Sequence, residues 1–136
     1  MGTPLYIYST QAMQEAYKAF TNAFSSQRTQ VCFAMKSNSN LAVIKTFADL
    51  GAGADVVSIG ELLKAKRAGI NSQKIVFSGI GKTEDEIRMA IKKRVLLINV
   101  ESENEVNLIN KISKKISKKT SIGIRLNPNI SGNTHK

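Results

Sequence analysis

Short apolar segments alternate with longer amphipathic segments along most of this chain. Most of the apolar segments are followed directly by Gly, Ser or Asn, which is typical of strands buried in a parallel sheet. The segments predicted as strands are residues 5–8, 31–36, 54–58, 75–78, 95–100 and 120–126.

The segments between these strands repeat an apolar side chain every three or four positions, which predicts amphipathic helices. The first helix begins at Ser9 or Thr10 as its cap, and a second follows Asn40. Three further helices each begin with a capping box, a Ser or Thr followed three residues later by a Glu. These boxes are Ser58 with Glu61, Thr83 with Glu86, and Ser102 with Glu105.

A strand followed by a helix, repeated several times, predicts an α/β protein with a parallel sheet. Counting from the strand at 31–36, five such strands are present, about five of the eight that a (β/α)₈ TIM barrel needs. The 136 residues are also fewer than the roughly 250 of a closed barrel, so we expect residues 1–136 to form an incomplete barrel domain. An open doubly wound sheet is the alternative, although no G-x-G-x-x-G motif follows the first strand.

The chain has 20 Lys and Arg residues against 10 Asp and Glu, a formal net charge of +10, which raises nucleic acid as a partner. The densest lysines, however, accompany an apolar stripe at Val106, Ile109, Ile112 and Ile116. This pattern indicates a surface helix with lysines on its solvated side. Aromatic residues make up only 6% of the chain and no nucleic-acid-binding motif is present, so we expect no nucleic-acid partner.

The cellular location of the protein and the redox state of its cysteine are indicated by its apolar segments and its cysteine content. No apolar run approaches the ~20 residues that cross a bilayer, and the N-terminus lacks the features of a signal peptide. The single cysteine, Cys32, cannot form an internal disulfide and suits a reducing compartment. We therefore expect a cytoplasmic protein that has no membrane partner, and we identify no metal site.

Charged residues at the predicted strand ends are the candidates for chemistry, because a buried charge is costly unless it is paired or used. Lys36 ends the strand at 31–36, on the same face as Ala34 and Cys32, at the sheet edge where α/β barrels keep their active sites. Asp55 lies near the start of the next strand and Arg125 near the end of the last one.

An enclosed lysine with an unprotonated amine can condense with a carbonyl group to form an imine. Schiff-base chemistry is therefore the predicted mechanistic class. The residues alone leave two carbonyl compounds open, pyridoxal phosphate and a sugar aldehyde.

The motifs TPLYIY, FAMKSNSN, GAGADVVSIGEL, IVFSGIGKTEDEI, INVESENEV and IRLNPNISGNTHK occur in this order. Together they resemble the first half of the diaminopimelate decarboxylases. These belong to the alanine-racemase-like, fold-type III enzymes that use pyridoxal 5'-phosphate, a group that includes ornithine and arginine decarboxylases. The resemblance covers nearly the whole chain and implies a barrel of the alanine-racemase-like type.

The resemblance implies that Lys36 is the catalytic lysine that binds pyridoxal phosphate covalently. It implies that Asp55 and Arg125 lie near the cofactor, with Glu61 and His135 as further cofactor-binding candidates. For Glu61 the capping box is the competing interpretation. The implied reaction is decarboxylation of meso-2,6-diaminopimelate to L-lysine by a homodimer with shared active sites.

The resemblance also implies that parts of the active site and the whole C-terminal β domain are absent from this chain. We therefore expect a truncated, inactive or split form with little or no turnover on its own. The alternatives are a non-catalytic remnant that still binds the cofactor, and a related amino-acid decarboxylase or alanine-racemase-like protein.

Overall fold

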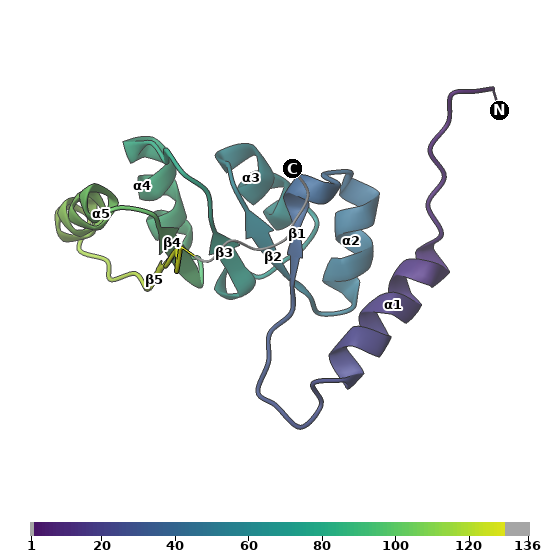
Figure 1. The fold of residues 1–136 in the computed structure, drawn as a ribbon. Helices are drawn as coiled ribbons and strands as arrows, with labels where there is room; N and C mark the ends of the chain where they lie inside the picture. The colour runs from purple at the N-terminus through teal and green to yellow at the C-terminus, as the bar shows by residue number, and fades with distance from the viewer. Residues whose placement is uncertain (1, 130–136) are drawn as a thin grey trace.

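A computed structural model describes residues 2–129 of the chain. Within them, five parallel strands form one sheet in which each strand pairs with the next along the chain (Figure 1). The strands are β1 (Cys32–Ala34), β2 (Gly53–Val56), β3 (Ile75–Phe77), β4 (Leu97–Val100) and β5 (Ile122–Ile124).

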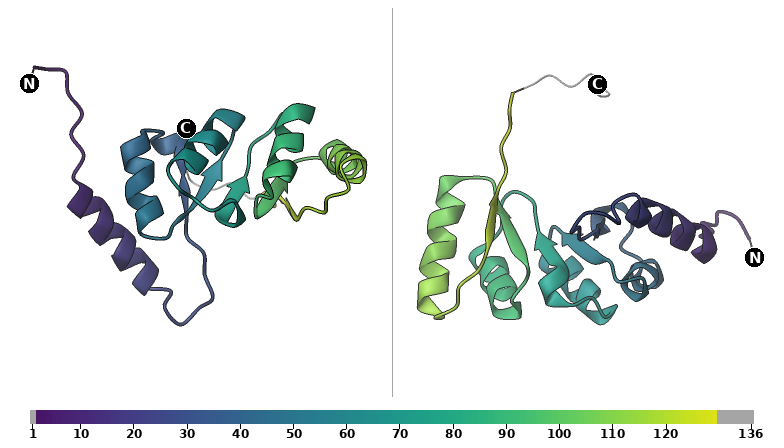
Figure 2. Two further views of the ribbon diagram at one scale, coloured as in Figure 1. Left: turned by 180° about the vertical axis from the view of Figure 1, so that it is seen from behind. Right: turned by 90° about the horizontal axis from the view of Figure 1, so that it is seen from below.

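Four helices connect successive strands and lie on one face of the sheet (Figure 2). They are α2 (Leu41–Asp49), α3 (Ile59–Arg67), α4 (Glu84–Lys93) and α5 (Glu103–Lys115), preceded by α1 (Thr10–Asn22) and joined by the short 3₁₀ turns η1 (Met35–Ser37) and η2 (Ser72–Lys74). A doubly wound sheet would reverse its strand order and carry helices on both faces. The consecutive order and one-sided cover therefore exclude that alternative and confirm part of a (β/α)₈ barrel.

The hydrophobic core lies between the sheet and these helices. Alternate residues of the three central strands point into it and are fully or almost fully buried, since successive strand side chains point to opposite faces. They are Ala54, Val56, Ile75, Phe77, Ile98 and Val100. The helices contribute apolar residues from one stripe each, including the predicted Ile109 and Ile112 of α5.

The predicted helix starts are confirmed, and only one has the reciprocal capping box. Thr83 accepts a hydrogen bond from the Glu86 N–H, and the Glu86 carboxylate accepts one from the Thr83 N–H at 2.9 Å. In α3 and α5 the cap serine accepts as predicted, but the glutamate accepts from the residue before the cap. In both forms the side chain of the cap residue satisfies a backbone N–H group that a helix start leaves unpaired.

The predicted strand at residues 5–8 is wrong. Leu5–Tyr8 form no strand, and Tyr6 is 87% exposed, because nothing in the described part of the chain pairs with their backbone. The following helix α1 does form, capped by Ser9, and packs on α2 with the rings of Tyr17 and Phe47 6.0 Å apart. No helix in residues 2–129 is long and apolar enough to span a membrane.

Candidate functional site

The sheet face opposite the helices, here called the inner face, carries mainly small and polar side chains. In β2, β3 and β4 they alternate with the buried core residues, and the register with β2 and β4 puts the residues of β1 and β5 on the same side of the sheet. The inner-face residues are Cys32, Ala34, Gly53, Asp55, Val76, Ser78, Leu97, Asn99, Glu101, Gly123 and Arg125. The polar groups of β2 to β5 thus lie on one side of the sheet, near or just after the carboxyl ends of their strands.

Lys36 lies just beyond the carboxyl end of β1, in η1. The predicted strand runs to Lys36, whereas the observed strand stops at Ala34, whose Cα pairs with that of Asp55. The Lys36 side chain is exposed and forms no hydrogen bond or ion pair with residues 2–129. The predicted enclosure around its amine is therefore not provided by the described residues.

Asp55 is an inner-face residue in the body of β2, not a loop carboxylate. The Ser78 hydroxyl donates a hydrogen bond to Asp55 Oδ1 at 2.5 Å, and Asn99 Nδ2 donates one to Ser78 Oγ at 2.9 Å. This chain of hydrogen bonds crosses β2, the end of β3 and β4. Sequence analysis missed both Ser78 and Asn99, although Asn99 interrupts the apolar run VLLINV and could have signalled a polar inner face.

Arg125 follows β5, at the opposite edge of the sheet from Lys36. Its guanidinium forms an ion pair with Glu101 at 3.3 Å, and its side chain is 69% exposed. As predicted, Gly123 lies on the same face, where a Cβ atom would come within 2.5 Å of Asn99 Oδ1. The described residues therefore link Arg125 to Glu101 and do not bring it against Lys36.

Lys82 is the one buried charged residue among those that the structure describes, and sequence analysis missed it. Its ammonium donates to the Gly79 carbonyl and pairs with Glu105 at 3.2 Å. The Lys82 and Glu105 side chains are 2% and 11% exposed. This pair fastens the loop after β3 to the start of α5, where Glu105 also accepts a hydrogen bond from the Glu101 N–H at 2.8 Å.

The two remaining predicted site residues differ in what the structure shows. Glu61 is half-buried at the start of α3, and its carboxylate accepts a hydrogen bond from the Val57 N–H at 2.8 Å, which is a capping contact. His135 lies outside the described residues.

Cys32 behaves as a packing residue. Burial raises the pKa of its thiol, the nearby Asp55 carboxylate raises it further, and Lys74 opposes both effects. The thiol packs closely on β2, since a Cβ atom on Gly53 would come within 2.7 Å of Cys32 Sγ. A thiol with a raised pKa is a poor nucleophile, so the surroundings of Cys32 fit a packing role.

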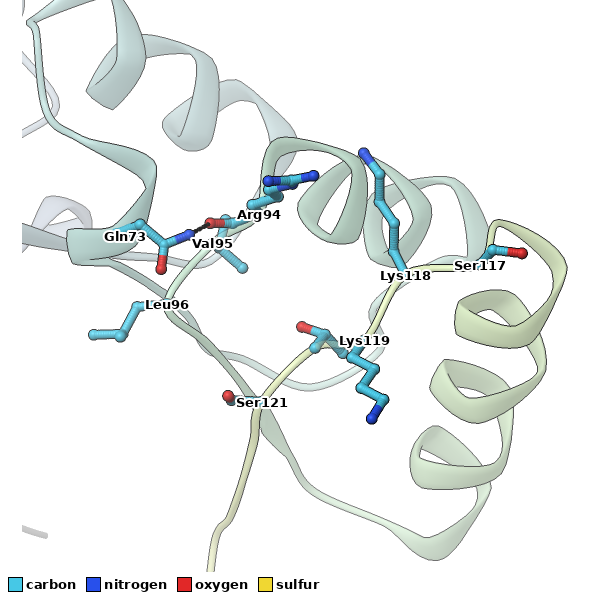
Figure 3. Close-up of a pocket in the computed structure, with 9 residues that line it drawn as sticks. Gln73, Arg94, Val95, Leu96, Ser117, Lys118, Lys119 and Ser121 are labelled. Atoms are coloured by element: carbon cyan, nitrogen blue, oxygen red, sulfur yellow. Dashed lines mark hydrogen bonds between the residues drawn. The ribbon is translucent and has the colours of Figure 1, made fainter.

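A cavity of about 610 Å³ opens at the other end of the sheet, beside the amino ends of β4 and β5 (Figure 3). Arg94, Lys118 and Lys119 are among its lining residues. Lys118 donates to the Lys92 carbonyl, and the Arg94 carbonyl accepts from Gln73. Basic side chains near the carboxyl ends of α4 and α5 complement the helix dipoles, so helix capping explains this cluster without a ligand.

The residues at the carboxyl edge fit pyridoxal phosphate chemically. Lys36 offers an unpaired amine for its aldehyde, and Asp55 and Arg125 offer polar groups on the same face. The arrangement can therefore hold a planar, polar molecule covalently at Lys36.

Comparison with known families matches residues 10–136 to the family described as "Pyridoxal-dependent decarboxylase, pyridoxal binding domain". Diaminopimelate decarboxylases from Aquifex aeolicus and Helicobacter pylori are 45% and 44% identical to 98% of this chain. The crystal structure of the Helicobacter pylori enzyme complexed with L-lysine aligns with 99% of the chain at 42% identity and a TM-score of 0.97. The arginine decarboxylase of Paramecium bursaria Chlorella virus, 22% identical over 88% of the chain and with a TM-score of 0.76, shares the fold.

The alignments cover 31% of the Aquifex aeolicus protein, 33% of the Helicobacter pylori sequence, and 34% and 32% of the two crystallised chains. The chain thus spans about a third of the length of its relatives. Because the family match includes most of the chain, this protein belongs to the pyridoxal-dependent decarboxylase family, as part of a diaminopimelate decarboxylase-like pyridoxal-binding barrel domain.

Proposed function

We propose that this chain supplies the cofactor-anchoring part of a pyridoxal-phosphate-dependent decarboxylase that converts meso-2,6-diaminopimelate to L-lysine. The observation that carries the proposal is the unpaired Lys36 amine at the carboxyl edge of the sheet, two residues beyond Ala34, whose Cα pairs with that of Asp55. The substrate is inferred from the diaminopimelate decarboxylases at 44–45% identity.

Lys36 would hold the cofactor through its amine and release it when the amine of the substrate takes its place. Asp55 and Arg125 would bind polar groups of the cofactor, with Glu61 and His135 as further candidates. When bound, pyridoxal phosphate supplies an electron sink for the carbanion that loss of a carboxylate leaves. A cytoplasmic location and a homodimer with shared active sites are part of the same proposal.

Borohydride trapping tests this role. The purified chain is incubated with pyridoxal phosphate, reduced with sodium borohydride and digested, and the modified peptides are identified by mass spectrometry. We expect the label on the peptide that contains Lys36, because its unpaired amine lies at the carboxyl edge of the sheet, beyond the strand that pairs with β2.

The matched control is Lys111→Ala, which removes an exposed lysine from the solvated side of α5. Lys36→Ala should abolish the dominant label, whereas Lys111→Ala should leave it unchanged. Equal labelling of Lys36 and the lysines of α5 would contradict the proposal, since it would show only the general reactivity of surface amines.

A further inference from the structure

Two polar residues on the inner face, Ser78 and Asn99, have no role in the chemistry described so far. Ser78 follows β3, and its backbone N–H donates to the Val56 carbonyl at 2.8 Å, which fixes it beside β2. Asn99 lies in β4 with its Cα paired to that of Gly123. Each side chain forms a hydrogen bond to the next strand in the direction of Asp55.

The donor direction along this chain is fixed by the number of protons available. A serine hydroxyl has one proton, and an ionised carboxylate can only accept. Ser78 therefore donates its proton to Asp55 Oδ1 and must accept from Asn99, which presents its amide nitrogen. The amide oxygen of Asn99 then faces Gly123, where the missing Cβ leaves room for it.

We propose that Ser78 and Asn99 are positioning residues that hold the Asp55 carboxylate in one orientation. Asn99 donates a hydrogen bond to Ser78, and Ser78 donates one to Oδ1 of Asp55, so one carboxylate oxygen already has a partner. The other oxygen receives no side-chain hydrogen bond from residues 2–129 and stays available to a polar group of a ligand. The functional value of this orientation rests on the proposed function, in which Asp55 binds the cofactor.

The first measurement is hydrogen exchange of the Asn99 side-chain amide protons, followed by NMR in the ¹⁵N-labelled chain without cofactor. Ser78→Ala removes the acceptor of Asn99, so we expect exchange to accelerate about fivefold, the effect of losing one hydrogen bond. Ser78→Thr keeps the hydroxyl and should restore slow exchange. Ser121→Ala, an exposed serine at the other end of the sheet, is the matched control and should change nothing.

The second measurement is the affinity for pyridoxal phosphate in a double-mutant cycle of Ser78→Ala and Asp55→Ala. We expect Ser78→Ala to weaken binding about fivefold in the original chain and to have no effect once Asp55 is alanine, because it acts through that carboxylate.

Unchanged Asn99 exchange in Ser78→Ala would overturn the proposal, and so would an equal loss of affinity in both backgrounds. If the unsubstituted chain binds no cofactor while the exchange result holds, the proposed function fails and the positioning role of Ser78 and Asn99 remains supported.

Discussion

The two faces of the sheet differ in what their side chains do. The face that packs against the helices, here called the outer face, consists of apolar residues such as Val56 and Phe77, both fully buried. The inner face carries Asp55, Ser78 and Asn99, which are half-buried and hydrogen-bonded to one another across the strands. The residues that stabilise the fold thus lie on one face and the candidate site residues on the other, at alternate positions of the same strands.

This difference teaches that neighbouring residues can have opposite consequences when substituted. Asp55 and Val56 are adjacent in β2. Asp55 accepts a hydrogen bond from Ser78 on the inner face, whereas Val56 packs in the hydrophobic core. Substitutions on the outer face should therefore change the free energy of unfolding, and those on the inner face should mainly change ligand binding.

The largest effect is expected for Phe77→Ala. Truncation of this fully buried ring should lower the free energy of unfolding by about 4 kcal/mol, from lost burial and the cavity it leaves. The measurement is urea unfolding followed by circular dichroism. Val76→Ala, its half-buried neighbour on the inner face, is the matched control. A cost for Val76→Ala equal to that for Phe77→Ala would break the distinction between the faces.

A smaller but still large effect is expected for Lys82→Ala. Removing the ammonium leaves the Glu105 carboxylate, only 11% exposed, without its partner, which should cost about 3 kcal/mol. The same urea unfolding measurement applies, with the exposed Lys93→Ala as control. A loss within about 0.5 kcal/mol, as for an ordinary surface change, would show that water reaches Glu105 and that the pair does not fasten the loop.

The smallest effect concerns pH and the capping box of α4. The backbone hydrogen bond from Thr83 lowers the pKa of Glu86 below its usual value of 4.5, an effect that partial burial opposes. Since the folded-state pKa is the lower one, this stabilisation is present above pH 4.5 and is lost as pH falls through the folded-state value. Glu86→Gln should therefore flatten the dependence of unfolding free energy on pH in that acidic range, without changing the inner face. An unchanged pH dependence would mean that the capping contact is absent in solution.

The architecture could be predicted from sequence because it depends on local patterns. Apolar runs and Ser/Thr-x-x-Glu boxes locate β2 to β4 and α3 to α5 correctly. The failure at Leu5–Tyr8 has a physical reason, since an apolar run forms a strand only where another strand pairs with its backbone.

The site could be predicted only in part. Lys36 and Asp55 are recognisable because each is a charge beside an apolar run. The Ser78–Asn99 contact and the Lys82–Glu105 pair join residues 21 and 23 positions apart, and they depend on how neighbouring strands and loops align. No local pattern specifies such alignment, so these contacts required the structure.

The most direct test of the central claim is a titration of the ¹⁵N-labelled chain with pyridoxal phosphate, followed by backbone amide chemical shifts. The claim is that the carboxyl edge of the inner face is the cofactor site. The largest shift changes are therefore expected at Ser37, Asp55 and Ser78, and they should disappear in Lys36→Ala. Shift changes centred on the lysines of α5, and unaltered by Lys36→Ala, would contradict the claim.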